Sequence, residues 1–381
     1  MNDAITPFSV DIPQSQLDDL KNRIANTRWP EQEVVDDWSQ GIPLAYTREL
    51  AQYWANEYDW RRWERKLNSW DQFTTVIDDI DIHFLHIKSP HADALPMIIT
   101  HGWPGSIVEF HKIIEPLTNP DDPSQAFHLV IPSIPGYGFS GKPTKPGTGA
   151  EQVGKMWGQL MARLGYDRYV AQGGDWGALI TQCMGTSETA HCAAIHVNMP
   201  ICPPDEAGMQ DMTEFEVAAL NGMAHYDQWD SGYAKQQSTR PQTLGYGLAD
   251  SAVGQMAWIV EKFWSWMDCG EGADQHPENV LSKDELLDNV MMYWLTNSAA
   301  SSGRLYWESF AKPNLAPIEM PMGASIFPKE IFRASRRWGE KRFSNIIQWN
   351  IMEKGGHFAA FEQPETFVGE LRQCFSGLRD S

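Results

Sequence analysis

Residues 169–177 read YVAQGGDWG, and they decide the fold more directly than any other stretch of the chain. The first four residues have the composition of a short buried strand. The next stretch, ALITQCMG at 178–185, is typical of the start of a buried helix. Gly173 and Gly177 stand two residues before and two residues after Asp175, and such small residues allow a tight turn between a strand and a helix. The stretch therefore predicts a strand, a sharp turn that presents Asp175, and a helix.

The same alternation of strand and helix continues on both sides of this turn. Short apolar segments bounded by Gly and Pro read as buried strands, and longer segments with apolar residues three and four apart read as helices. The predicted strands are PMIITHG (96–102), FHLVIP (127–132), AAIHVNMP (193–200), GASIFP (323–328) and IIQWNIM (346–352), and the clearest predicted helices are 150–164 and 364–375. Alternating strands and helices predict an α/β fold with a mostly parallel sheet and helices on both faces.

The alternation stops after Met199-Pro200 and returns only near residue 319. The intervening residues show helical patterns without a buried strand, for example at 255–266 and 286–295. A helical insertion that follows a sheet strand predicts a cap over the sheet.

The first 90 residues precede this core and form a separate pattern. A helical pattern opens at Ile12-Pro13, and we expect Trp29-Pro30 to end it. Alternation at 73–77 and 80–86 predicts a hairpin with Asp78-Asp79 at its turn. These boundaries predict four parts: an N-terminal arm with the first hairpin at 1–90, a first core part at 91–199, a helical cap at 200–318 and a second core part at 319–381.

The composition excludes several classes of protein. The chain has 381 residues, of which 42% are hydrophobic, so it supports a large buried core. Its formal net charge of −20 would repel nucleic acid and anionic membrane surfaces. The five cysteines show no metal-ligand spacing, and their odd number is typical of a reduced, cytoplasmic protein. The start lacks the features of a signal peptide, and no apolar run reaches about 18 residues, so we expect no membrane anchor.

Asp175 stands at the centre of a pattern that resembles the nucleophile elbow G-x-S-x-G, with Asp in place of Ser. A carboxylate held out at such a turn is a nucleophile that can displace a leaving group from an sp³ carbon. The backbone N–H of the next residue, Trp176, would donate to an oxyanion. Gly-Gly-Asp is also common in ordinary turns, so the motif needs support from elsewhere in the chain.

Two further loops provide that support. One loop is His101-Gly102-Trp103-Pro104-Gly105, at the end of the predicted strand PMIITHG. In this fold the loop after that strand supplies the second oxyanion donor, which here is the N–H of Trp103. The same five residues would also suit a plain β-turn. His357 follows the last predicted strand in a glycine loop, which fits the chain order nucleophile, acid, histidine, and predicts that it is the base.

The acid partner of His357 should follow the preceding strand. Glu330 does so, and it would hold the imidazole tautomer and stabilise its charged form. A surface Glu in the first turn of a helix is the alternative interpretation of Glu330. Glu319 and Asp250 are the rival candidates, and we favour Glu330 because it lies directly past the strand end.

At these residues the chain resembles the microsomal-type epoxide hydrolases, a family of the α/β-hydrolase fold that includes soluble fungal members. The resemblance runs nearly from end to end. It is carried by PFSVDIPQSQLDDLKNRIANTRWP (7–30), HGWPGS (101–106), GGDWG (173–177), SGYAKQQSTRPQTLGYGLADSAVG (231–254), FPKE (327–330) and GGHFAAFE (355–362). The chain differs from membrane-bound members in starting directly at the arm, and it resembles the mammalian type in having Glu as the acid.

The resemblance implies that Tyr233 and Tyr306 point from the cap into the site, where two phenols would donate to an epoxide oxygen. It also implies hydrolysis of a small-molecule epoxide by water to a vicinal diol through an ester on Asp175, without metal or organic cofactor. The resemblance further implies that the N-terminal arm wraps the core and cap, often aiding dimer formation, so it points to a homodimer.

Two alternatives from other classes remain open at this point. A haloalkane or haloacid dehalogenase uses the same Asp nucleophile, and Trp103 and Trp176 would suit its need for halide-binding donors. A non-catalytic binding protein of the same fold would be expected to lose part of the triad, whose positions are all filled here. A serine esterase is disfavoured because the elbow has no Ser.

Overall fold

The computed structural model describes residues 3–311 and 313–379. The described residues form a nine-stranded sheet of order β1-β2-β3-β5-β4-β6-β7-β8-β9. Its strands are β1 (Thr6–Phe8), β2 (Gln72–Ile77), β3 (Ile80–Ile87), β4 (Leu95–Thr100), β5 (Phe127–Pro132), β6 (Tyr169–Gly173), β7 (Cys192–Val197), β8 (Met322–Ile326) and β9 (Ile346–Ile351). Every residue of β6 and β8 is buried, as the continuous apolar runs predicted.

The strands from β5 to β9 in this order pair in parallel, and β1, β2 and β3 add an antiparallel edge. The predicted hairpin is confirmed as β2 and β3. Asp78 and Asp79 form its turn with positive φ of 52° and 63°, a conformation that Asp tolerates better than most residues. The mostly parallel core places the carboxyl ends of β4, β6, β8 and β9 at one edge, where their loops meet.

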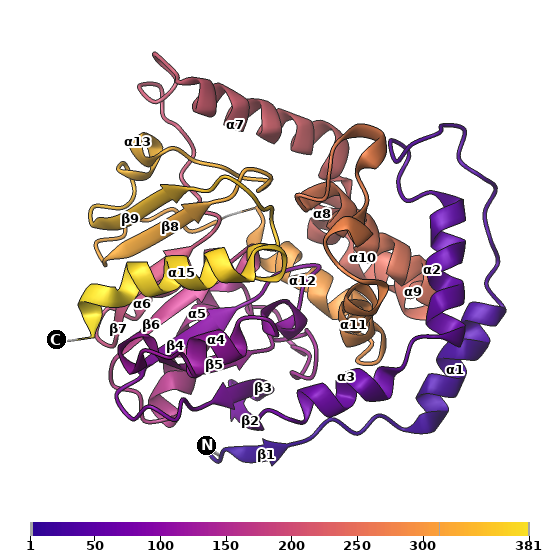
Figure 1. Ribbon diagram of the computed structural model, residues 1–381, viewed down its shortest axis with the longest axis horizontal. Coiled ribbons are helices and arrows are strands. Elements are labelled where there is room, and N and C mark those ends of the chain that lie inside the picture. Colours follow the sequence, from indigo (N-terminus) through magenta and orange to yellow (C-terminus); the bar gives the residue numbers. More distant parts are fainter. Residues whose placement is uncertain (1–2, 312, 380–381) are drawn as a thin grey trace.

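Helices of the core pack on this sheet, and α15 crosses in front of it in the view of Figure 1. These helices are α4 (Ile114–Thr118), α5 (Ala150–Arg163), α6 (Trp176–Ser187), α13 (Arg336–Gly339), α14 (Ala359–Glu362) and α15 (Pro364–Phe375). Short 3-10 turns complete the loops as η1 (Ile107–Phe110), η2 (Pro123–Gln125), η4 (Gly272–Asp274), η5 (Pro277–Asn279) and η6 (Ser376–Leu378). The helix predicted at 364–375 is confirmed at both ends.

Between β7 and β8 the chain is helical, as predicted. The segment comprises α7 (Glu214–His225), the π-helix η3 (Tyr226–Asp230), α8 (Gly232–Thr239), α9 (Pro241–Asp250), α10 (Ala252–Trp266), α11 (Lys283–Trp294) and α12 (Ala299–Ser309). Figure 1 shows α8 to α12 gathered beside the sheet, with α7 extending above it. The division of the chain at residues 90, 199 and 318 stays a prediction.

The N-terminal helices α1 (Gln14–Ala25) and α2 (Leu44–Asn56) lie on the outer side of α9, α10 and α11 in Figure 1, and α3 (Trp60–Leu67) lies below them. One expectation for this region was wrong, because the first helix ends at Ala25 and not at Trp29-Pro30. The N–H of Asn26 donates to the carbonyl of Asn22 and the N–H of Thr27 to that of Ile24, which closes the last turn before the proline is reached.

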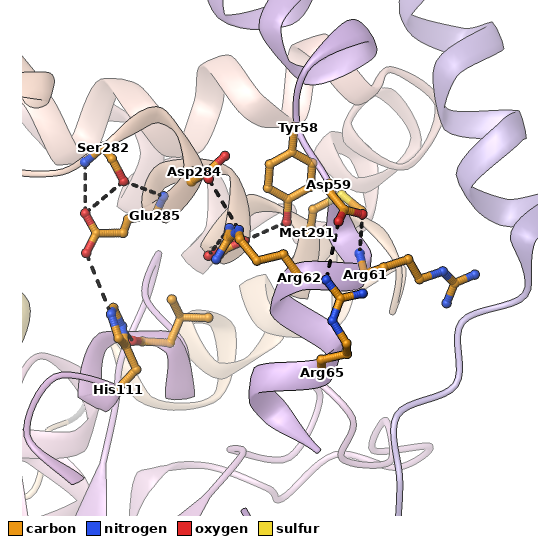
Figure 2. A network of polar contacts seen from close by, with 12 residues as sticks. Tyr58, Asp59, Arg61, Arg62, Arg65, His111, Ser282, Asp284, Glu285 and Met291 are labelled. Atoms are coloured by element: carbon orange, nitrogen blue, oxygen red, sulfur yellow. Dashed lines mark hydrogen bonds and ion pairs between the residues drawn. The ribbon is translucent and has the colours of Figure 1, made fainter. Parts of the chain in front are cut away.

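A buried ion pair joins this arm to α11. Arg62 of α3 places Nη2 2.7 Å from Oδ1 and 2.8 Å from Oδ2 of Asp288, whose side chain is 1% exposed. The phenol of Tyr58 donates to the same carboxylate at 2.7 Å. Figure 2 shows Arg62 reaching from α3 toward Asp284, which lies one helical turn before Asp288 on α11. The arm therefore fixes the position of a helix that belongs to the segment above the sheet.

Candidate active site

Asp175 occupies the sharp turn between β6 and α6. Its backbone has φ 51° and ψ −126°, a strained conformation for a residue with a side chain. A Cβ on Gly173 would lie 2.0 Å from the carbonyl oxygen of Gly177, and a Cβ on Gly177 would lie 2.0 Å from that of Thr100. Glycine at both positions is therefore what allows the turn, and the turn places the carboxylate at the carboxyl edge of the sheet.

The loop after β4 lies directly against this carboxylate. The N–H of Trp103 donates to Oδ1 of Asp175 at 2.7 Å. His101 in the same loop is buried, and burial lowers the pKa of its imidazole to about 4, so it is neutral and braces the loop through Gly102 and Ile134. The N–H of Trp176 opens α6 immediately after Asp175, in the first turn where helical N–H groups have no partner within the helix.

His357 lies in the loop after β9 and contacts both acids. Its Nε2 is 3.3 Å from Oδ2 of Asp175, and its Nδ1 is 2.6 Å from Oε1 of Glu330. Burial disfavours the imidazolium, but the carboxylates of Glu330 and Asp175 outweigh it and raise the pKa of His357 well above its usual value. A bridge between Lys329 and Gly356 holds the two loops side by side.

The structure separates Glu330 from its two rivals. Glu330 follows β8 outside any helix, and its side chain has no exposed surface. Glu319 is exposed ahead of β8, and Asp250 is 88% exposed at the end of α9, where it pairs with Arg23. Of the three acids, Glu330 is the one that contacts His357.

The two tyrosines of the helical segment meet above Asp175. Tyr233 comes from α8 and Tyr306 from α12, both are buried, and their hydroxyl oxygens are 3.5 Å apart. The ring of Tyr233 stacks on the indole of Trp103, with the ring centres 4.6 Å apart. Burial raises the pKa of both phenols well above the usual value, so both stay protonated and can donate.

Sequence reasoning missed a third tyrosine. The hydroxyl of Tyr226, in the π-helix η3, is 3.1 Å from that of Tyr233. Seven residues separate the two, a spacing that returns to the same face of a helix, and this was the signal that could have found it.

Sequence reasoning also missed a buried acid close to Asp175. Glu109 lines a small cavity of about 10 Å³ together with Asp175, His357, Gln172 and Asn198. That volume is close to what one water molecule occupies. Burial raises the pKa of Glu109 to about 8. A Cβ on Gly105 would overlap the Glu109 carboxylate. The sequence signal that could have revealed this contact is therefore a Gly four residues before an acid that stands in an apolar run.

Asp175 also lines a larger, mostly apolar cavity of about 300 Å³. Both tyrosines line it, and most other lining side chains are aliphatic or aromatic. They include Trp176, Leu179, Met199, Met223, Phe310, Ile331, Phe332 and Trp338. Asp175 therefore lines both a water-sized cavity and a wide apolar one.

Known proteins resemble this chain over nearly its whole length. The family model for the epoxide hydrolase N terminus matches residues 5–110, and that for the alpha/beta hydrolase fold matches residues 96–249. A putative epoxide hydrolase of Stigmatella aurantiaca (strain DW4/3-1) is 50% identical over 382 residues, covering 99% of this chain and 86% of that protein. The chain belongs to the epoxide hydrolase family. Epoxide hydrolase 1 of Sus scrofa is 33% identical over 410 residues, covering 99% of this hydrolase and 89% of the pig protein.

Solved structures agree with this assignment. Juvenile hormone epoxide hydrolase of Bombyx mori superposes with a TM-score of 0.93 at 31% identity, covering 99% of this chain and 95% of that one. The Aspergillus niger epoxide hydrolase superposes with a TM-score of 0.89 at 34% identity, covering 98% and 96%. The predicted α/β-hydrolase fold and the predicted family are therefore confirmed.

The described residues contain neither a candidate metal site nor a candidate membrane-spanning helix. Within residues 3–311 and 313–379, no group of three or more His, Cys, Asp or Glu side chains is arranged to hold a metal ion. No helix in those same ranges combines the length and hydropathy needed to cross a bilayer.

Proposed function

We propose that this hydrolase converts an apolar epoxide to a vicinal diol through a covalent ester on Asp175. The observation that carries the proposal is the unbroken contact from Asp175 to His357 to Glu330, beneath two buried phenols. The apolar cavity supports an apolar substrate, because few of its lining groups could compensate a buried charge.

In the first step the epoxide oxygen accepts hydrogen bonds from Tyr233 and Tyr306. Oδ2 of Asp175 attacks one ring carbon from the side away from the epoxide oxygen, and the C–O bond of that same carbon breaks. This gives a hydroxyalkyl ester and an alkoxide that takes a proton from a tyrosine. Oδ1 keeps its bond to the N–H of Trp103. The phenols stabilise charge that appears only as the ring opens, so their effect is catalytic.

Formation of the ester prepares His357 for the second step. The Asp175 charge helps to raise the pKa of His357 in the free enzyme. Esterification removes that charge, so the burial that favours the neutral imidazole weighs more heavily, and the Nε2 proton neutralises the tyrosinate that ring opening leaves. His357 becomes a base at the moment when one is needed, while Glu330 holds its Nδ1 proton.

Water then attacks the Asp175 carbonyl from the side of the small cavity that His357 and Glu109 line. Its proton passes to Nε2 of His357, and the N–H groups of Trp103 and Trp176 stabilise the oxyanion. The ester C–O bond breaks, the departing alkoxide takes the proton back from His357, and the diol leaves. Asp175 retains one oxygen from water, and its carboxyl proton passes to Nε2 of His357, which restores the free enzyme.

The variant His357→Gln tests this scheme. It should still form the ester but fail to hydrolyse it, so the mass of the intact protein should increase by one epoxide. Asp175→Asn is the matched control and should gain no mass. Steady diol formation by His357→Gln would contradict the two-step route. Halide release from a parallel haloalkane panel, without diol from epoxides, would instead assign a dehalogenase.

A further inference from the structure

A lysine is buried directly behind one of the two tyrosines. Lys262 of α10 has a side chain only 8% exposed, and its Nζ lies 5.2 Å from the ring centre of Tyr233 and 5.7 Å from that of Trp266. Trp103 already stacks on one face of the Tyr233 ring, so the ammonium covers the other. The proposed reaction, as derived so far, makes no use of this cation.

The other groups around Lys262 interact favourably with its ammonium group. Its Nζ is 2.7 Å from Oε2 of Glu261 and 3.4 Å from the carbonyl oxygen of Asp230. The Asp230 carboxylate is occupied by the hydroxyl of Ser265 at 3.0 Å. Two oxygens and two aromatic faces therefore surround the ammonium, an arrangement that retains a charged lysine inside the protein.

The two tyrosines differ sharply in their surroundings. Tyr306 meets the edges of Trp103 and Trp176 and stacks with Phe310. Among the described residues, no Lys or Arg lies over the ring of Tyr306. Tyr233 has both the Lys262 cation on its ring and the Tyr226 hydroxyl at its oxygen.

Bound substrate would decide which hydroxyl donates in the contact between Tyr226 and Tyr233. A phenol has one proton, so a Tyr233 that donates to the epoxide must accept from Tyr226. Both neighbours then act in the same sense, since a donor at the oxygen and a cation over the ring each stabilise negative charge on Tyr233.

We propose that Lys262 and Tyr226 are positioning residues that make Tyr233 the stronger acid of the pair, so that the opening epoxide takes its proton from Tyr233 while Tyr306 only orients it. The inference rests on the proposed ester mechanism and adds an asymmetry to it. Lys262 touches neither substrate nor the reacting atoms and acts through the ring of Tyr233.

Single-turnover kinetics on the full chain test the asymmetry, with ester formation followed separately from ester hydrolysis. Lys262→Met should slow ester formation by ~10- to 30-fold, the size expected for a desolvated cation–π contact, and leave hydrolysis unchanged. Lys262→Arg, which retains the cation, should recover most of the rate. Lys235→Met is the matched control, because Lys235 is exposed on α8 two residues from Tyr233.

A double-mutant cycle distinguishes this effect from a loss of packing. Lys262→Met should have its full effect in a Tyr306→Phe background and almost none in a Tyr233→Phe background. Binding of phenylacetamide, whose carbonyl accepts from the tyrosines without reaction, should weaken with Lys262→Met and recover with Lys262→Arg. Because Lys262→Met leaves Glu261 unpaired, Lys262→Met/Glu261→Gln should be measured beside it to exclude misfolding.

Equal loss in both tyrosine backgrounds, or slowing of formation and hydrolysis alike, would overturn the inference and leave Lys262 a structural tether. Wild-type ester formation in a folded Lys262→Met variant would overturn it too. The proposed function fails by a different result, namely absence of any ester in His357→Gln, so the two failures are distinguishable.

Discussion

The substitution Glu109→Gln tests whether the small cavity beside Asp175 holds a protonated acid. Burial raises the pKa of Glu109 from 4.5 to about 8 in the folded protein, with the Asp175 carboxylate adding to the rise and His357 opposing it. The side chain is close to isosteric with Gln, which stays neutral at all relevant pH values. The comparison therefore isolates the titration of one carboxyl group.

The expected difference in unfolding free energy between wild type and Glu109→Gln follows from proton linkage. Between pH 4.5 and about 8 the folded state holds a proton on Glu109 that the unfolded state has released. The stability contributed by this group is therefore fully present below pH 4.5 and is lost as the pH rises toward 8, at about 1.4 kcal/mol per pH unit. Glu109→Gln lacks this slope, so its advantage over wild type should grow by about 2 kcal/mol from pH 6.0 to 7.5.

Urea unfolding of both proteins at the two pH values measures this difference. In thermal melts, 2 kcal/mol corresponds to about 2–3 °C for a chain of this length. Glu362 is also buried near His357, with a pKa raised to about 7, but it is common to both proteins and cancels in the comparison. Parallel pH profiles for wild type and Glu109→Gln would refute the reasoning, because they would mean that Glu109 ionises alike in both states.

Two further predictions concern the arm and the triad. Arg62→Met should lower the free energy of unfolding by about 1.5–3 kcal/mol, the size of a hydrogen bond to a charged group, because the buried Asp288 side chain then keeps the Tyr58 hydroxyl but loses its cation. Arg65→Met, at a 71% exposed pair, should cost less than about 1 kcal/mol. Equal effects in chemical denaturation would contradict the role of the Arg62–Asp288 pair. Glu330→Gln removes the charge beside His357, so it should lower the pKa of His357 and cut kcat by at least ~100-fold. Ester hydrolysis should slow more than ester formation when both rates are measured by stopped flow. Equal changes in the two rates would count against an orienting role for Glu330.

Much of the fold could be predicted because its signals are local. Alternation around Asp78-Asp79 specified the hairpin, and the glycines around Asp175 specified the elbow. Strand β1 was not predicted, since Thr6–Phe8 is a three-residue edge strand without alternation. The first helix was predicted to run too far, because the closing contacts of Asn26 and Thr27 cannot be recognised from residue type alone.

The site divides in the same way. Asp175, Glu330 and His357 each follow a predicted strand, so strand order alone brings them to one edge of the sheet. Tyr226 and Lys262 come from helical elements whose faces depend on packing against the arm and core, and local sequence does not determine that packing. Their contacts with Tyr233 required three-dimensional structure, and the choice of Tyr233 itself came from family resemblance.

The proposed mechanism requires that water attacks the carbonyl carbon of an ester on Asp175, so that the carboxylate gains one oxygen from water. A single turnover of excess enzyme with an epoxide in ¹⁸O-labelled water, followed by mass spectrometry of the peptide that contains Asp175, tests it most directly. If the ester forms, the label enters Asp175 and the first diol formed is unlabelled. Label in that first diol, with none in Asp175, would mean that water attacks the epoxide directly, and would contradict the account.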